Sequence, residues 1–450
     1  MNVCRTALIA TLSLIALACS SAMAQFFEEQ WPTWRGPTST GVAPKGNPPI
    51  TWSETENIKW KVKMPDDGES TPVIWNDKIF IQTAVPMTEQ SADSFDKEKH
   101  PEKDRHQQPR AKKDTVAWRF SVLCLDRETG KTLWDTTVKE VVPHARHHAT
   151  ASHAPYSIVT DGQLLWAGFG SRGLHCLDMD GNIVWSADLP EMNMYSEYGE
   201  GSSPAIAGDN IIVVQDDMED ATIFAFDKHT GDLSWKKDRG SGHSAWSTPL
   251  TVNVDGKLQV ITSGNKFMSS YDAETGDIIW TCSVPNTGTV PSPVAGHGNV
   301  YYMCGHPGSS LMALKLGGEG DLSDSESIVW KMLNTTSTPY VTSPLLYDDR
   351  IYFMKKYRGN ISCFNAITGE PIFEEQALEG LRRCYASPVG AAGRIYVADR
   401  AGKIAVIKHS DTFEVLAVNS LDEGFDASPV IVGNELFLKG EHHLYCIAKP

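Results

Sequence analysis

The sequence has no hydrophobic run after residue 24 that is long enough to cross a membrane. It is also poor in positive charge, since 40 lysines and arginines stand against 56 aspartates and glutamates, for a formal net charge of −16. A nucleic-acid partner requires a basic face, so this balance argues against one. There is no Cys-x-x-Cys-His haem site, Cys-x-x-Cys zinc pair, His-Glu-x-x-His, nucleophile elbow or phosphate-binding loop. The common catalytic signatures are therefore absent.

The first residues predict a secretory signal peptide over residues 1–24. Arg5 supplies a positive charge, residues 7–18 are apolar, and residues 20–24 end in an Ala-x-Ala cleavage site. Lipid attachment at Cys19 is an alternative, although the leucine usual three residues before a lipidated cysteine is missing. We therefore expect an exported protein, periplasmic or extracellular, with no transmembrane segment.

The cysteines left after export do not predict disulfides. Four of them, Cys124, Cys176, Cys363 and Cys446, stand at the same position of a repeat. Equivalent positions in neighbouring copies are held apart in a ring, so these residues are expected to be small buried thiols.

A short phrase recurs along the chain at intervals of 41 to 51 residues, apart from one longer gap. Each copy begins with a small residue and a proline and continues into a β-rich run, and most copies then have a turn of the form Asp-x-x-Thr-Gly-x-x-x-Trp. A period of this length with several short strands in each copy predicts a β-propeller. The copies begin at Thr71-Pro72, Ala154-Pro155, Ser203-Pro204, Thr248-Pro249, Ser292-Pro293, Ser343-Pro344, Ser387-Pro388 and Ser428-Pro429.

The geometry of the turn near the end of each copy accounts for the residue types found there. A short hairpin loop needs a residue at positive φ, which glycine adopts without steric cost. The tryptophan that follows is expected to pack flat against the neighbouring blade. The tryptophans with this predicted structural role are Trp60, Trp134, Trp185, Trp235, Trp280 and Trp330.

The two ends of the repeat region complete one another. The last copy supplies three strands before the chain stops at Pro450, and residues 58–62 form a tryptophan-bearing strand with no partners before it. Pairing the two ends in one blade leaves no exposed sheet edge. We therefore predict an all-β protein: an eight-bladed propeller of four-stranded antiparallel blades over residues 57–450, preceded by an N-terminal extension over residues 25–56.

Two unusual segments are predicted on one face of this propeller. The polar insertion 86–118 separates the second and third strands of the first copy and is expected to be disordered in isolation. The connection into the second copy carries His144, His147, His148 and His153. Clustered imidazoles can bind zinc, copper or nickel, although no carboxylate or thiol completes a familiar spacing. Solvated histidines remain the alternative.

Residues just before the first strand of each copy should form a rim around the channel mouth. A rim that mixes aromatic side chains with both charge signs suits a polar or peptide-like partner. The pair Arg382-Arg383 is either an anion contact at this mouth or an ordinary surface pair. The predicted rim residues are Glu69, Glu200, Trp246, Tyr340, Arg383 and Asp426.

The run from Ala225 to Trp235 resembles the tryptophan-docking motif of pyrroloquinoline-quinone (PQQ) repeat propellers, and residues 126–134 and 272–280 agree with it. The segment Trp31 to Pro37 resembles one that precedes such propellers in exported bacterial proteins. The chain is thus similar to the PQQ-like β-propeller family, in the branch of the propeller lipoprotein of the outer-membrane β-barrel assembly machinery. The motif lies between blades, so it specifies the fold and not a cofactor.

The resemblance implies two kinds of function. Quinoprotein dehydrogenases hold PQQ with calcium on the axis, and the roles of stacking tryptophan and catalytic aspartate would fall to Trp246 and Asp426. This chain has no adjacent pair of cysteines and is short for that branch. We therefore predict a monomeric, non-enzymatic recognition or scaffold module without a cofactor, binding a protein, a peptide or a cell-envelope component. A PQQ-dependent oxidoreductase is the alternative.

Overall fold

The computed structural model describes residues 25–65, 68–87, 114–264, 266–285, 288–306, 308–356 and 358–450. The predicted signal peptide, Cys19 and most of the insertion 86–118 lie outside these residues. None of the helices in the described part of the chain has both the length and the hydrophobicity that a bilayer span requires.

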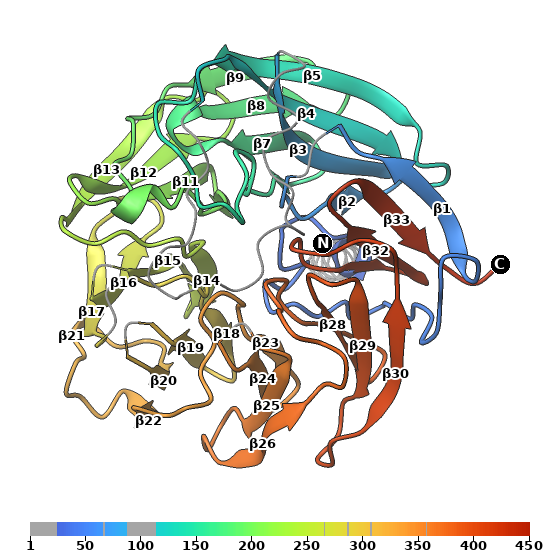
Figure 1. The fold of residues 1–450 in the computed structure, drawn as a ribbon. Helices are drawn as coiled ribbons and strands as arrows, with labels where there is room; N and C mark the ends of the chain where they lie inside the picture. The colour runs from blue at the N-terminus through green and yellow to red at the C-terminus, as the bar shows by residue number, and fades with distance from the viewer. Residues whose placement is uncertain are drawn as a thin grey trace, which may run out of the picture.

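Eight sheets surround a central axis (Figure 1). In seven of them the strands follow one another outward in chain order, whereas the outermost strand of the eighth is the first strand of the chain. From the inside out, blade 1 consists of β2 (Val73–Trp75), β3 (Lys78–Pro86), β4 (Trp118–Asp126) and β5 (Thr132–Val141), and blade 2 consists of β6 (Val159–Thr160), β7 (Leu164–Gly168), β8 (Leu174–Asp178) and β9 (Ile183–Ala187). Blade 3 consists of β10 (Ala205–Ala207), β11 (Asn210–Gln215), β12 (Ala221–Asp227) and β13 (Leu233–Gly240). Blade 4 consists of β14 (Leu250–Val254), β15 (Lys257–Gly264), β16 (Phe267–Asp272), β17 (Ile278–Ser283) and the additional strand β21 (Gly320–Asp321). Blade 5 consists of β18 (Val294–Gly296), β19 (Asn299–Cys304), β20 (Ser310–Lys315) and β22 (Ile328–Leu333), and blade 6 consists of β23 (Leu345–Tyr347), β24 (Arg350–Met354), β25 (Asn360–Asn365) and β26 (Pro371–Ala377). Blade 7 consists of β27 (Val389–Ala391), β28 (Arg394–Ala398), β29 (Lys403–Lys408) and β30 (Val415–Ser420). Blade 8 consists of β31 (Val430–Val432), β32 (Glu435–Lys439), β33 (His443–Ile447) and β1 (Ile58–Lys63). The predicted eight-bladed propeller is confirmed.

The N-terminal strand closes the last blade, as the sequence predicts. Strand β1 pairs antiparallel with β33, and Trp60 stands opposite Cys446. The ring therefore joins residues from the two ends of the chain through backbone hydrogen bonds, with no disulfide: all seven described cysteines are buried and unpaired.

A closed ring of hydrogen bonds runs round the axis where the innermost strands begin. In each blade the backbone N–H of one small residue donates to the side-chain hydroxyl of the equivalent residue in the next blade, over 2.8 to 3.1 Å. The second copy contributes Ser157, three residues beyond the alanine expected from the sequence, because this position must supply a hydroxyl. The members are Thr71, Ser157, Ser203, Thr248, Ser292, Ser343, Ser387 and Ser428.

Tryptophans on the outermost strands join five of the blades to the next one. Trp235 donates its indole N–H to the carbonyl of Ala273 over 3.2 Å, and its ring lies against Gly276 in the turn of the following blade. Gly276 has φ +73°, and a Cβ there would lie 2.5 Å from the ring. The equivalent indole bonds run from Trp60 to Arg127, Trp134 to Met179, Trp185 to Lys228 and Trp330 to Ala366.

The interface between blades 4 and 5 is built differently. The loop before β22 adds β21 in parallel to the outer strand β17, with Trp280 opposite Gly320. Leu322 packs in the same hydrophobic cluster as Trp280, which is fully buried. A strand and a leucine therefore take the place of the glycine turn at this interface.

The N-terminal extension closes one end of the axis. Trp31 exchanges two backbone hydrogen bonds of 2.9 Å with Ile74 in blade 1, and Arg35 reaches the carbonyls of Pro344 (2.8 Å) and Pro388 (3.0 Å) in blades 6 and 7. Only 2% of Arg35 is exposed, and it pairs with no carboxylate of the described residues. Burial lowers the pKa of Arg35 to about 9. The extension thus spans the axis on the side of the A–B turns, which we call the turn face.

Candidate functional site

The opposite side of the propeller, the loop face, carries the connections into each innermost strand and the loops between the second and third strands. Residues 144–153, the connection into blade 2, extend over the mouth of the axis and form what we call the strap. The side chain of Thr150 lies close to that of Tyr385, which leads into blade 7. Burial, together with the nearby charge of Arg400 in blade 7, lowers the pKa of His148. The mouth is therefore partly covered by the strap.

The strap is fixed at its end by the base of the polar insertion. His153 is buried, and its Nε2 lies 2.8 Å from Oδ2 of Asp114. The ring of Trp118 packs edge-on against His153 with the centroids 4.7 Å apart. Burial lowers the pKa of His153 to about 4 despite the opposing effect of Asp114. His153 is consequently a neutral anchor at ordinary pH.

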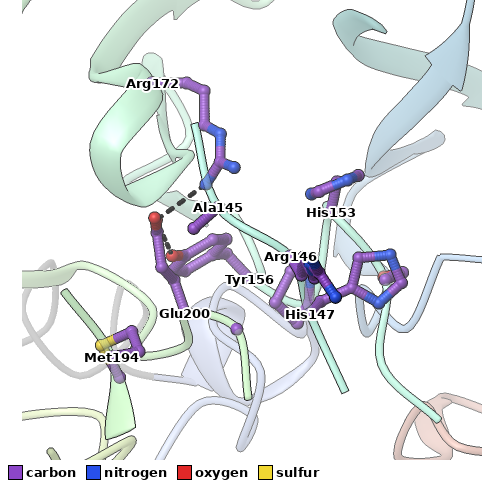
Figure 2. A pocket seen from close by; sticks show the side chains of 11 residues that line it. Ala145, Arg146, His147, His153, Tyr156, Arg172, Met194 and Glu200 are labelled. Carbon is purple, nitrogen blue, oxygen red and sulfur yellow. Dashed lines mark hydrogen bonds and ion pairs between the residues drawn. The ribbon is translucent and has the colours of Figure 1, made fainter. Parts of the chain in front are cut away.

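A small pocket beneath the strap contains a buried ion pair (Figure 2). Arg172 Nη1 lies 2.9 Å from Glu200 Oε2, and both side chains are about 95% buried. Glu200 also accepts hydrogen bonds from the hydroxyl of Tyr156 (3.0 Å) and from the backbone and hydroxyl of Ser171 (2.8 and 2.7 Å). Such a fully bonded carboxylate holds loops of blades 2 and 3 together. Glu200 therefore supports the rim from inside.

The four histidines do not converge on a common point. His144 Nε2 lies 3.1 Å from the carbonyl of Met192, His147 Nδ1 lies 2.8 Å from the carbonyl of His148, and His148 Nδ1 lies 2.8 Å from the Thr150 hydroxyl. His153 is held by the Asp114 carboxylate. The described part of the chain contains no group of three or more His, Cys, Asp or Glu side chains placed to hold a metal ion.

The connection into blade 3 displays two tyrosines that the sequence reasoning missed. Tyr195 is 55% exposed and Tyr198 is 37% exposed, and their rings meet edge-on at 5.9 Å. The short helix η4 (Tyr195–Glu197) carries them with Ser196 and Glu197 at φ +54° and +53°. Such a backbone persists only where its surroundings enforce it. The only signal in the sequence was two tyrosines in an unusually long connection.

The remaining predicted rim residues lie at the starts of the innermost strands, but most are engaged. Trp246 donates its indole N–H to Gly199 over 2.8 Å. Asp426 pairs with Arg400 over 2.7 Å, and the Arg400 guanidinium stands 4.5 Å above the Tyr385 ring. These contacts cross-link connections from different blades, so they stiffen this part of the rim.

Three further rim residues lie elsewhere on the loop face. Glu69 is half-buried, and its carboxylate interacts electrostatically with the Arg400 guanidinium. Tyr340 packs against His306 with ring centroids 5.1 Å apart, and Arg383 is half-buried in the connection to blade 7. The structure thus groups Glu69, Arg383 and Asp426 by position on blades 7, 8 and 1, away from Glu200 and Trp246.

A quinone held with calcium would need a free stacking tryptophan and a set of oxygen ligands near the axis. The indole of Trp246 is bound to its neighbour, and the carboxylate of Asp426 is occupied by Arg400. The described residues offer no cluster of acidic, histidine or cysteine side chains for the ion. Both side chains named for the quinone role are therefore held by other residues of the chain.

Comparison with known proteins supports the predicted family. The outer membrane protein assembly factor BamB of Burkholderia pseudomallei (strain K96243) is 21% identical over 329 residues, which cover 70% of this chain and 76% of that protein. The protein of the same name from Yersinia pestis is 20% identical over 332 residues, covering 71% and 77%.

A solved structure shares the fold as well. The quinohemoprotein alcohol dehydrogenase of Comamonas testosteroni superposes with a TM-score of 0.60 at 10% identity, covering 94% of this chain and 81% of that one. Such a distant likeness shows the architecture alone. The sequence model of the family described as outer membrane protein assembly factor BamB matches residues 119–375, more than half of the chain. The chain therefore belongs to this family of PQQ-like propellers.

Proposed function

We propose that the protein is a non-enzymatic recognition module that works outside the cytoplasm and binds a protein of the outer-membrane assembly machinery on its loop face. Membership of the assembly-factor family supports the class of partner. The observation that carries the choice of face is the exposed pair Tyr195 and Tyr198 on a strained turn.

This tyrosine pair has the properties of a binding hot spot. Tyrosine offers a large, stiff contact area with a polar tip, and such residues dominate the energetics of protein interfaces. A rigid turn that already holds both rings lowers the entropy lost on binding. Arg146 and Glu197 lie 3.8 Å apart beside the pair, with 39% and 40% of their side chains exposed. They provide the polar border that surrounds interface centres.

The other surfaces of the propeller are less suitable. The extension covers the axis on the turn face, where Trp31 and Arg35 are buried. Exposed apolar residues on the outer strands lie in ones to threes on separate blades, as with Leu233 on β13, Ile183 and Val184 on β9, and Val415, Leu416 and Val418 on β30. Small groups of exposed apolar residues are common on any protein surface.

Capture of the partner from an envelope extract tests the proposal. Immobilised wild-type protein is compared with the double variant Tyr195→Ala/Tyr198→Ala and with Ile183→Ala, which removes a side chain 45% exposed on outer strand β9. We expect the tyrosine variant to lose most of the captured assembly protein and the control to retain it, with unchanged melting of both. Equal capture by all three proteins would contradict the proposal.

The quinone alternative has its own measurement. Purified protein is mixed with PQQ and calcium, and dye reduction is followed with a range of alcohols and sugars. We expect no turnover above that of the free quinone, because Trp246 and Asp426 are already occupied. Saturable dye reduction would place the protein with the oxidoreductases.

A further inference from the structure

We propose that a small inorganic anion, such as chloride or phosphate, binds on the propeller axis between Arg35 and the hydroxyl ring. The hydroxyl ring is the set of eight serine and threonine side chains, from Thr71 to Ser428, that accept backbone hydrogen bonds from one blade to the next. The site lies inside the molecule, between the extension on the turn face and the strap on the loop face. It requires no partner protein, so it is independent of the proposed function.

Arg35 carries a buried positive charge without a counter-ion. Only 2% of the residue is exposed, and its pKa is lowered by burial with no opposing effect from any carboxylate of the described residues. Other buried arginines are paired, since Arg172 binds Glu200 over 2.9 Å and Arg239 binds Asp216 over 2.7 Å. A buried charge is costly unless an opposite charge compensates it, so Arg35 requires an anion that the described residues do not supply.

The guanidinium of Arg35 also has hydrogen-bond donors to spare. Its two Nη groups donate to the carbonyls of Pro344 (2.8 Å), Pro388 (3.0 Å) and Thr40 (3.3 Å). Its Nε is buried and has no acceptor among the described residues. A guanidinium has five N–H groups, so these three bonds leave donors for one further ligand.

Neighbouring residues of the extension hold this guanidinium in place. Gly41 has φ +89°, and a Cβ there would lie 2.2 Å from Nη2 of Arg35, so only glycine leaves room for the group. The Trp34 ring lies 5.5 Å from Cζ, close enough for a favourable contact between the cation and the ring. The charge is therefore kept on the axis by the residues around it.

The hydroxyl ring supplies further donors next to Arg35. Pro344 and Pro388, whose carbonyls bond the guanidinium, directly follow the ring members Ser343 and Ser387. Each ring hydroxyl accepts a backbone N–H, and none of the eight donates a hydrogen bond to another described residue. Seven of these eight side chains are buried. Because a hydroxyl is both a donor and an acceptor, their O–H groups remain available around the axis.

This combination of groups selects an anion over the other small occupants of a channel. A metal cation would be repelled by the charge of Arg35. A water molecule could accept hydrogen bonds from the hydroxyl ring, but it would leave that charge without compensation. An anion accepts hydrogen bonds from both and forms the stronger, charge-assisted kind with the guanidinium.

Thermal unfolding of the whole protein tests the inference in solution. Chloride or phosphate replaces gluconate at constant ionic strength, so the screening of surface charges stays the same. An anion that binds only the folded state should raise the melting temperature saturably, by about 2 °C or more at about a hundredfold excess over its dissociation constant. A rise with either anion supports the site and identifies its occupant.

Two matched variants locate the effect. Arg35→Met removes the charge on the axis and should abolish the rise in melting temperature. Arg394→Met removes another buried arginine, which lies on β28, outside the innermost strand of blade 7, and bonds the Asn47 side chain. This control should keep the full rise.

Crystals of the wild-type protein grown with bromide provide a second measurement, which does not depend on the folding of a variant. We expect an anomalous bromide peak within hydrogen-bond distance of the Arg35 guanidinium and of at least one hydroxyl of the ring. Three results would overturn the inference. These are no rise in melting temperature with chloride or phosphate, an equal rise in the wild-type protein and in Arg35→Met, or bromide peaks elsewhere with none on the axis.

Discussion

Replacing Gly276 by alanine tests how the blades are joined. The backbone at Gly276 has φ +73°, which costs an alanine about 1–2 kcal/mol. The new Cβ would also lie 2.5 and 2.6 Å from two carbons of the Trp235 ring, well inside the usual contact distance of about 3.5–4.0 Å. Forcing such a ring aside costs about 1–3 kcal/mol. The total expected loss in free energy of unfolding is about 2–5 kcal/mol.

Gly256 provides a matched control in the same blade. Its φ is +85°, but a Cβ there would meet nothing within 4 Å. Gly256→Ala should therefore show the backbone cost alone, about 1–2 kcal/mol. The difference between the two variants measures the packing of the tryptophan against the turn. Urea unfolding followed by tryptophan fluorescence provides the comparison, with the slope checked for a common denatured state.

A double-mutant cycle completes the measurement. In a Trp235→Ala background the ring is absent, so Gly276→Ala should cost no more than Gly256→Ala. Equal losses for the two glycines in the wild-type background would refute the docking argument. So would a full Gly276→Ala penalty that persists without the tryptophan.

Three other predictions concern stability. Ser343→Ala removes the acceptor of the 2.8 Å bond from the Ser292 N–H and should cost about 1–3 kcal/mol. The control Ser410→Ala removes only a surface hydrogen bond to the Thr412 carbonyl and should change unfolding little. Equal effects of the two variants in urea melts would deny the hydroxyl ring a role in stability. Burial lowers the pKa of His153 and of His175 to about 4, so the unfolded chain binds more protons between about pH 6.5 and 4. The free energy of unfolding should be highest above pH 6.5 and should fall by up to about 3 kcal/mol per histidine as the pH drops toward 4. His175→Asn should make the stability less dependent on pH, as measured by thermal unfolding across this range. An unchanged pH dependence in that variant would contradict the prediction. Deleting the chain up to Lys63 exposes the edge of β33 and empties the Trp60 site, so the product should aggregate or lose cooperative unfolding in calorimetry, and a melting curve like the parent's would disprove closure by β1.

The fold was predictable because its determinants repeat in the sequence. The unpaired strand around Trp60 and the incomplete last copy together predicted the closure seen between β1 and β33. The second copy was misaligned because Ala154-Pro155 matches the small residue and proline of the other copies. The ring of hydroxyls at the axis instead selects Ser157. The requirement for a hydroxyl was visible in the other copies, all of which carry serine or threonine.

The site was less predictable from the sequence, because each of its contacts occurs only once and joins residues that are far apart in the chain. Arg35 bonds the Pro388 carbonyl across 353 residues, and Thr150 meets Tyr385 over the channel mouth. Neither contact recurs from one copy of the repeat to the next, so the repeat pattern could not predict it. The sequence places Trp246 shortly before an innermost strand, but only the geometry shows that its indole is already bonded.

Hydrogen exchange on the complex with its captured partner tests the central claim most directly. The account predicts new protection on the loop face, in the strap 144–153 and around Tyr195 and Tyr198. The outer strands β5, β9 and β13 and the extension around Arg35 should exchange as in the free protein. Protection confined to those strands or to the turn face, with the loop face unchanged, would contradict the account.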